Sequence, residues 1–358
     1  MDIRDNLYKL IKDINDWNTI KNIYDEENSK CFILEFKTFS DRQFSLSDLL
    51  YCVCRKGNIE LVNKFITTMK KDYYWWYGLE GACEGGDLQI INKMLVYNKK
   101  HIHPGLFGAC RGGHIEIAKY MINMGAKNFN QGLCYACHNS HINLINLMIE
   151  KGATDLNEAL FGACKGGNMN IVQMIINIGA TDFNNGLNGA CEGGHIEIAK
   201  YMIKMGANNL DKALEWACEY NNNIEIADYI INLGACNLTT AIETALFCDN
   251  LDLTKYLIKK AKSKIDCKID YKIVFDSKCG SENNEHFDEF GVDMNKEYNE
   301  LVLIFLLENG VERDELVEIP CSTRIFDKLD LRNTHIKETL DEIIVPDVAK
   351  VISSYYHV

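Results

Sequence analysis

The sequence predicts an all-α protein in which short helix pairs repeat along the chain and stack into a solenoid. Three observations lead to this fold class. A motif that first appears as Gly-Ala-Cys-Glu-Gly-Gly at Gly81 recurs at a constant spacing of 27 residues. Turn-forming residues divide each repeat into two short helical segments, and the second segment carries its apolar residues on one helical face. Because one such pair cannot bury its apolar face alone, neighbouring pairs must stack.

The repeat period is read from six copies of the motif. The copies begin at Gly81, Gly108, Tyr135, Gly162, Gly189 and Trp216. Weaker copies begin on either side, at Cys52 and Leu246, and an additional asparagine within 221–223 lengthens one unit by one residue. The period therefore predicts an array of about eight units.

Each unit is predicted to contain two helices separated by a turn. In one unit the first helix runs from about Gly105 to Arg111, and Gly112-Gly113 ends it because glycine adopts turn conformations readily. The second helix follows as Ile115–Ile122, and a Gly-Ala pair closes it. The residue before each second helix is predicted to be its N-cap. These residues are Asp87, His114, His141, Asn168, His195 and Asn223.

One unit carries a recognisable family pattern. Residues 104–114 read PGLFGACRGGH, which resembles the ankyrin signature Thr-Pro-Leu-His-x-Ala-Ala-x-x-Gly-His, and residues 115–126 resemble the second ankyrin helix. The resemblance extends from about residue 46 to residue 265 and, more faintly, over 299–311. It implies an ankyrin-type helical repeat solenoid that acts as a protein–protein interaction scaffold, with a host or viral partner protein in its concave groove.

The units differ from the ankyrin pattern in their length. An ankyrin unit has 33 residues, whereas these units have 27. The difference lies between units, where only Lys127–Gln131 separates one Gly-Ala pair from the next Gly-Leu pair. Tight loops are therefore expected in place of long β-hairpin fingers. Short units of this kind are similar to those in ankyrin families of giant DNA viruses, which implies a viral protein in the host cytoplasm.

The pattern divides the chain into three parts. Residues 1–45 do not match the repeat and are predicted to form an N-terminal cap, and residues 46–265 form the ankyrin-like array. Residues 266–358 are predicted to hold a degenerate repeat and a C-terminal helical cap, with an acidic loop at 281–300. Residues 336–358 are also similar to the F-box-like segment of viral ankyrin proteins. That similarity gives an alternative function, a substrate adaptor that recruits a host ubiquitin ligase.

Composition narrows the classes of partner. The 358-residue chain has a formal net charge of −13 and a pI near 5.2, so it repels a phosphate backbone and nucleic acid is not expected as a partner. The N-terminus lacks the apolar stretch of a signal peptide. The longest apolar run, Leu301–Leu307, is far shorter than the roughly 20 residues of a membrane span. We expect a soluble, cytoplasmic monomer without membrane contact or cofactor.

One cysteine recurs in every unit and forms a ladder that is predicted to lie in the core, because buried cysteine behaves as a small hydrophobic residue. The ladder consists of Cys83, Cys110, Cys137, Cys164, Cys191 and Cys218. Stacked helices lie about 8–10 Å apart, which is too far for disulfides between equivalent cysteines.

An alternative of another class is a metal-binding protein. Its ligands would be Cys134, Cys137, His138 and His141. The repeat itself explains two of these four residues, the ladder cysteine and the histidine at the N-cap position. The sequence contains neither a phosphate-binding loop nor a nucleophile elbow, so a non-enzymatic protein is predicted.

The residue after the ladder cysteine varies from unit to unit. The ankyrin resemblance implies that this position and the next one line the concave groove and bind the partner. The residues are Glu84, Arg111, His138, Lys165, Glu192 and Glu219, with Asn139 and Tyr220 at the second position. Their charge changes sign along the array, which suits recognition of one patterned partner. The alternative is that they are merely solvated polar positions.

A run of five aromatic residues, Tyr73–Tyr77, precedes the first clear unit. Consecutive side chains cannot all face the core, and exposed tryptophan is common at binding hot spots. Trp75 and Trp76 are therefore predicted to bind a partner. The alternative is an enlarged hydrophobic seam between two units.

Overall fold

The computed structural model describes residues 46–68, 75–98, 101–220, 223–248, 250–263, 306–307 and 311. Every regular element in these residues is a helix, which confirms the predicted all-α class. The chain divides into two compact units, residues 1–230 and 231–358. The predicted N-terminal cap (1–45), the acidic loop (281–300) and the F-box-like segment (336–358) lie outside the described residues.

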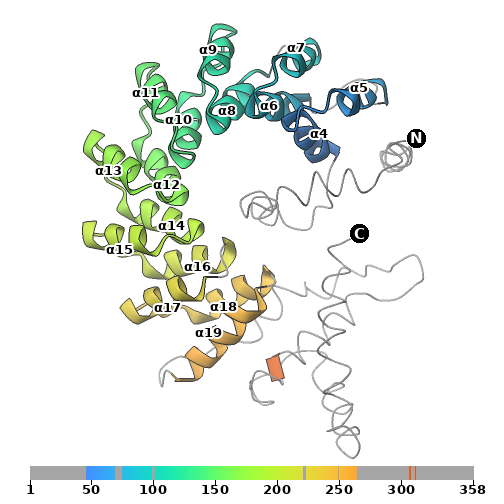
Figure 1. Ribbon diagram of the computed structural model, residues 1–358. Helices are drawn as coiled ribbons and strands as arrows, with labels where there is room; N and C mark the ends of the chain where they lie inside the picture. Colours follow the sequence, from blue (N-terminus) through green and yellow to red (C-terminus); the bar gives the residue numbers. More distant parts are fainter. Residues whose placement is uncertain are drawn as a thin grey trace, which may run out of the picture. The chain divides into compact units, whose positions relative to one another are not determined.

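The first unit consists of alternating first and second helices (Figure 1). The first helices are α4 (Leu46–Arg55), α6 (Trp75–Gly85), α8 (His103–Gly112), α10 (Phe129–His138), α12 (Leu156–Gly166), α14 (Phe183–Gly193) and α16 (Leu210–Tyr220). The second helices are α5 (Ile59–Thr68), α7 (Leu88–Tyr97), α9 (Ile115–Asn123), α11 (Ile142–Glu150), α13 (Met169–Ile178), α15 (Ile196–Met205) and α17 (Ile224–Leu233), which crosses the unit boundary.

The second unit contains a further pair of the same kind. It is formed by α18 (Leu238–Phe247) and α19 (Leu251–Ser263), and Nζ of Lys260 on α19 donates to the side chain of Asn232 at 3.0 Å. None of the described helices in either unit has the length and apolar character needed to cross a membrane.

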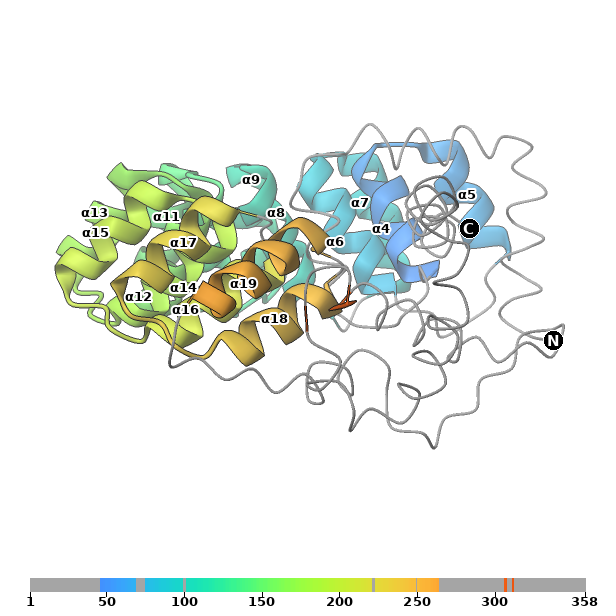
Figure 2. The ribbon, with the colours of Figure 1, turned by 90° about the horizontal axis from the view of Figure 1, so that it is seen from below.

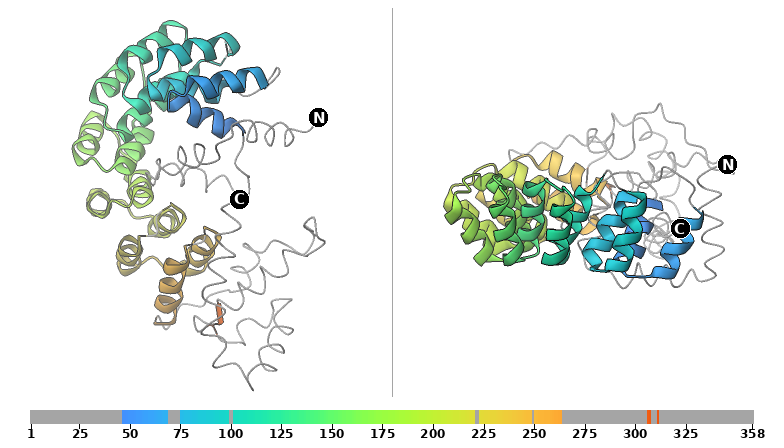
Figure 3. Two further views of the ribbon diagram at one scale, coloured as in Figure 1. Left: turned by 45° about the vertical axis from the view of Figure 1, so that its right-hand side comes forward. Right: turned by 90° about the horizontal axis from the view of Figure 1, so that it is seen from above.

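Within the first unit, the first helices line the inner side of a curved stack and the second helices cover its outer side (Figure 1). Successive pairs lie side by side along the stack (Figure 2, Figure 3). The core lies between the two layers, where Leu79 of an inner helix and Met94 of an outer helix are completely buried. Equivalent apolar residues repeat this arrangement in the following pairs.

The cysteine ladder lies in this core, as predicted, and all six of its members are buried. Burial raises the pKa of Cys110 and Cys164 to about 12. A thiol with such a pKa is protonated at neutral pH and is a poor nucleophile or metal ligand. The ladder therefore acts as a small apolar spacer between the helix layers.

Pairs of glycines bring the backbones of neighbouring inner helices into contact. A Cβ on Gly108 would lie 2.0 Å from the backbone oxygen of Glu80, and a Cβ on Gly112 would lie 2.2 Å from that of Glu84. Both distances are far below van der Waals contact, so even alanine would push the helices apart. The same pairs occur as Gly81 and Gly85, Gly162 and Gly166, and Gly189 and Gly193. Because these helices approach so closely, the stack curves toward its inner side.

The prediction that histidines cap the second helices is wrong. Asparagine and aspartate at this position do cap, by accepting bonds from first-turn amides; these are Asp87, Asn168 and Asn223. The histidines make no such bond. Instead, Nε2 of His141 donates to the backbone oxygen of Arg111 at 3.1 Å, and His114 and His195 reach the preceding unit in the same way. The shorter asparagine side chains do both: Nδ2 of Asn168 donates to the Ser140 hydroxyl at 3.0 Å, and Nδ2 of Asn223 donates to the backbone oxygen of Gly194 at 3.4 Å.

The loops between units are short, and asparagine side chains hold them where β-hairpin fingers would be paired by backbone bonds. Oδ1 of Asn157 accepts the backbone amides of Thr181 and Asp182 at 2.9 and 3.0 Å. Asn130 and Asn184 bind the equivalent loops identically. The predicted solenoid without long fingers is therefore confirmed for the residues that the structure describes.

The packing of histidine on the preceding glycine turn gives a first test. Gly167 has φ +82°, and a Cβ there would lie 2.4 Å from the ring of His195, whereas Gly206 has φ +113° and nothing within 4 Å. We expect Gly206→Ala to lower the free energy of unfolding by about 1–2 kcal/mol through backbone strain. Gly167→Ala should lower it further, and the excess should vanish in a His195→Ala background. Urea denaturation of the variants measures these values, and equal costs at both glycines would contradict the contact.

The asparagine clamps give a second test. Asn157→Ala leaves two loop amides without their acceptor, so we expect the free energy of unfolding to fall by roughly 1–2 kcal/mol. Hydrogen exchange at the amides of Thr181 and Asp182 should accelerate at the same time. Asn170→Ala, at an exposed site on α13, is the matched control. The clamp is refuted if exchange at the two amides is the same in both variants.

Candidate functional site

A single row of side chains on the inner helices contains most of the predicted partner-binding residues. It is formed by the residue that follows the ladder cysteine in each pair, and we call it the inner row. Its members are Arg55, Glu84, Arg111, His138, Lys165, Glu192 and Glu219. Because the inner helices stack in register, equivalent side chains of neighbouring pairs lie next to one another.

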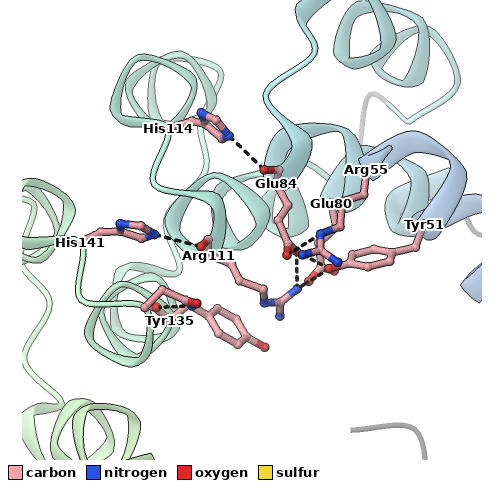
Figure 4. A network of polar contacts seen from close by, with 9 residues as sticks. Tyr51, Arg55, Glu80, Glu84, Arg111, His114, Tyr135 and His141 are labelled. Carbon is pink, nitrogen blue, oxygen red and sulfur yellow. Dashed lines mark hydrogen bonds and ion pairs between the residues drawn. The ribbon is translucent and has the colours of Figure 1, made fainter. Parts of the chain in front are cut away.

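The first three members of the inner row form an ionic network (Figure 4). Nε of Arg55 lies 2.9 Å from one carboxylate oxygen of Glu84, and Nη1 of Arg111 lies 3.1 Å from the other. Arg111 also donates to Glu80 and to the hydroxyl of Tyr51, each at 3.0 Å. That hydroxyl in turn donates to Glu84. Figure 4 shows these side chains converging from α4, α6 and α8.

This network is buried, which changes the role expected for its members. Glu84 is only 9% exposed, so its carboxylate faces groups of the protein itself. Burial alone would lower the pKa of Arg111, but Tyr51, Glu80 and Glu84 raise it well above its ordinary value, and the guanidinium stays charged. Removal of one member of such a buried pair typically costs about 3–5 kcal/mol. The network therefore ties the first three inner helices together.

A second ion pair lies further along the inner row. Nζ of Lys165 is 2.8 Å from Oε1 of Glu192, whose side chain is 7% exposed. The sequence predicted that the alternating charges of the inner row recognise a partner. In the structure, these alternating charges place opposite charges on neighbouring helix pairs of the protein itself. Glu84 and Glu192 are therefore internal ion-pair partners in this structure.

The remaining inner-row residues are more accessible. His138 is half-buried between the two ion-paired groups, and burial together with the positive charges of Lys165 and Arg111 lowers its pKa to about 4. The adjacent Asn139 is exposed and donates its side-chain amide to a backbone oxygen of its own helix. Glu219 is half-buried at the end of the row, and burial raises the pKa of its carboxyl group.

Two aromatic residues on the inner face were not identified from the sequence. Tyr135 on α10 and Trp216 on α16 occupy the position where α6, α8, α12 and α14 have the first glycine of the pair. The guanidinium carbon of Arg111 lies 4.3 Å from the centre of the Tyr135 ring. Trp216 packs edge-on against Phe161 with 5.5 Å between ring centres, and stacks on Tyr220 at 5.1 Å. The replacement of glycine by an aromatic residue at this repeat position is the feature of the sequence that could have identified them.

The aromatic residues before the first clear unit differ in their burial. Trp75 is 6% exposed and packs on Tyr97 with 5.0 Å between ring centres, so its predicted role in partner binding is corrected to a role in the seam between α6 and α7. Trp76 is half-buried beside Tyr77 and His101. Tyr73 and Tyr74 lie outside the described residues.

The proposed metal ligands are not brought together as a set. Sγ of Cys134 is 3.7 Å from the carboxylate of Glu158, Cys137 is in the core, and His141 uses its Nε2 on a backbone oxygen. Among the described residues, no group of three His, Cys, Asp or Glu side chains is placed to hold a metal ion. The four residues instead take separate structural roles in the repeat.

A match to a known protein family covers the later part of the first unit and the start of the second. Residues 133–212 and 160–240 match the family model for ankyrin repeats in three copies. This segment contains the Lys165–Glu192 ion pair and the Trp216–Tyr220 stack. No curated protein matches the chain.

The depressed pKa of His138 predicts a pH dependence of stability. Its folded pKa of about 4 lies below the ordinary value of about 6.5, so between these values the unfolded chain binds more protons than the folded chain. Stability is therefore lost as pH falls through this window. We expect His138→Gln to lose less free energy of unfolding than the wild type between pH 7 and about 4.5, by roughly 2 kcal/mol.

Urea denaturation at a series of pH values measures this difference. The same substitution at exposed His101 reports the effect of a histidine-to-glutamine change outside the inner row. Parallel pH profiles of the wild type and the His138→Gln variant would show that His138 does not lie in the environment described.

Proposed function

Because this chain is an ankyrin repeat protein, we propose that it is a non-catalytic interaction scaffold that binds a partner protein along its inner helices. Ankyrin repeats are in general protein–protein interaction modules. The binding surface of this proposal consists of side chains that vary between pairs while the glycine, alanine and cysteine frame recurs. These side chains are Tyr135, His138, Asn139, Phe161, Trp216, Glu219 and Tyr220.

The observation that carries the proposal is the half-buried aromatic cluster on the inner face. Trp216 contacts both Phe161 and Tyr220, yet none of the three is fully covered by the described residues. Large, rigid aromatic side chains of this kind are the usual anchors of protein interfaces. Core packing alone does not require a tryptophan where the neighbouring inner helix has glycine, so a binding role accounts for it better.

The chemistry of the inner face supports binding rather than catalysis. The recurring cysteines are nucleophiles by type, but burial holds them as protonated thiols. Five of the seven inner-row groups are engaged in ion pairs with one another, as in Arg111 with Glu84 and Lys165 with Glu192. Groups engaged in this way hold the inner helices together and orient the side chains beside them.

Position-specific crosslinking tests the proposal. A photoreactive phenylalanine analogue replaces Tyr135 or Tyr220 on the inner helices, and in the matched control it replaces Tyr120, which is 38% exposed on outer helix α9. After irradiation in cells that express the tagged chain, we expect the same partner protein to crosslink from both inner positions and not from Tyr120. Mass spectrometry identifies it. Crosslinks from Tyr120 alone, or from none of the positions, would refute binding along the inner face.

A further inference from the structure

The inner face already contains one site that binds a cation, and it shows which groups such a site needs. The guanidinium of Arg111 lies over the ring of Tyr135 at 4.3 Å. It also donates to the carboxylates of Glu80 and Glu84 at 3.0 and 3.1 Å. An aromatic face with carboxylates beside it binds a cation through both the ring quadrupole and the negative charge. In this first site, the protein supplies the cation from its own chain.

The joint between α14 and α16 repeats the aromatic part of that site, whereas the positions equivalent to Glu80 and Glu84 hold Phe161 and Lys165. Trp216 is the equivalent of Tyr135, three units later in the repeat. The position equivalent to Arg111, however, is Glu192, and the next member of the inner row is Glu219. Two acidic residues therefore follow each other in the row, whereas the earlier part of the row places Glu84 between two arginines.

One carboxylate at this joint forms no ion pair among the described residues. Lys165 pairs with Glu192 at 2.8 Å, and Lys212 pairs with Glu215 at 2.5 Å. Burial raises the pKa of the Glu219 carboxyl group, while a hydrogen bond from Tyr220 and the charge of Lys212 lower it and are outweighed. The hydrogen bond places this carboxylate beside the Tyr220 side chain. Two lysines thus stand against three glutamates, and a basic group of a partner would balance the remaining negative charge.

The aromatic side chains at this joint are arranged to receive such a group. Trp216 and Tyr220 are stacked with an angle of 16° between their planes, and Phe161 meets Trp216 edge-on. A guanidinium carries five donors in a plane that stacks on aromatic faces, so it fits the rings and a carboxylate together.

We infer that the surface formed by Phe161, Trp216, Glu219 and Tyr220 binds an arginine side chain of the partner protein. This inference rests on the proposed function, because it names the chemistry that the partner presents to the inner face. The arginine would lie over the Trp216 ring as Arg111 lies over the Tyr135 ring in the first site, with Glu219 as the carboxylate beside it. The partner is accordingly a protein with an exposed basic segment, which also suits the acidic balance of the whole chain.

Two short peptides of defined sequence test this inference on the full-length chain. One is acetyl-Gly-Arg-Gly-Arg-Gly-amide, and the other has glutamate in place of arginine. The readout is the indole N–H signal of Trp216 in a nitrogen-15 spectrum, assigned with Trp216→Phe. We expect saturable shifts with the arginine peptide only. No shift with the arginine peptide, or equal shifts with both peptides, would overturn the inference.

Substitutions then test which negative charge binds the arginine peptide. Glu219→Gln removes the negative charge at constant shape, and we expect it to raise the Kd of the arginine peptide roughly three- to tenfold. Glu150→Gln, the same change at an exposed site on outer helix α11, should leave the Kd unchanged. An equal effect of the two substitutions would contradict a site at Glu219. Thermal unfolding of each variant confirms that the fold is intact.

Charge reversal separates this inference from the proposed function. Glu219→Arg supplies an internal cation beside Glu192, so we expect it to keep or raise thermal stability and to abolish binding of the arginine peptide. If the partner identified by crosslinking from Tyr135 binds this variant with unchanged affinity, the arginine site is refuted and the scaffold function stands. If the peptide binds as expected but no partner crosslinks from the inner positions, the scaffold function is refuted instead.

Discussion

Close contact between the backbones of neighbouring inner helices is the constraint on which the inner face depends. Glycines at two positions one helical turn apart, such as Gly108 and Gly112, remove every side-chain atom that would separate one inner helix from the carbonyl oxygens of the previous one. At this separation the inner-row side chains of adjacent pairs reach ion-pair distance, as Arg111 and Glu84 do at 3.1 Å. Close approach on one side only also makes the stack curve. The same small residues therefore set both the curvature and the internal ion pairs.

The inner face changes character where the glycines are replaced. Tyr135 and Trp216 put a ring between helices that elsewhere touch through their backbones, and these rings are half-buried on the inner side. The guanidinium of Arg111, from the same chain, lies over the first ring, that of Tyr135. The second lies where the inner row continues with Glu192 and Glu219. The binding surface that we propose is thus centred on an aromatic joint, while the glycine joints bring neighbouring inner helices into backbone contact.

Side chains also replace the backbone pairing that longer repeats obtain from β-hairpin fingers. Asn157 binds two amides of the following loop through one oxygen, and His141 crosses the preceding glycine turn to reach the backbone of Arg111. Both contacts join a unit to its neighbour, and in a solenoid such nearest-neighbour contacts hold the array together. A unit of 27 residues is therefore coupled to the next one without the additional residues of a finger.

The period, the two helices of each unit, the short loops and the buried cysteine ladder can all be predicted from the amino-acid sequence. These features follow from local spacing and residue size, which act within one unit and recur in each. The period also identifies equivalent positions, and hence that Glu84, Arg111 and Glu192 belong to one row. Three outcomes are visible only in the folded chain: Arg111 pairs with Glu84 and Lys165 with Glu192, His141 reaches Arg111 instead of capping its helix, and Trp75 is buried. Each of those outcomes depends on the separation between neighbouring helices, which is set by packing and is not encoded in the spacing of residues along the chain.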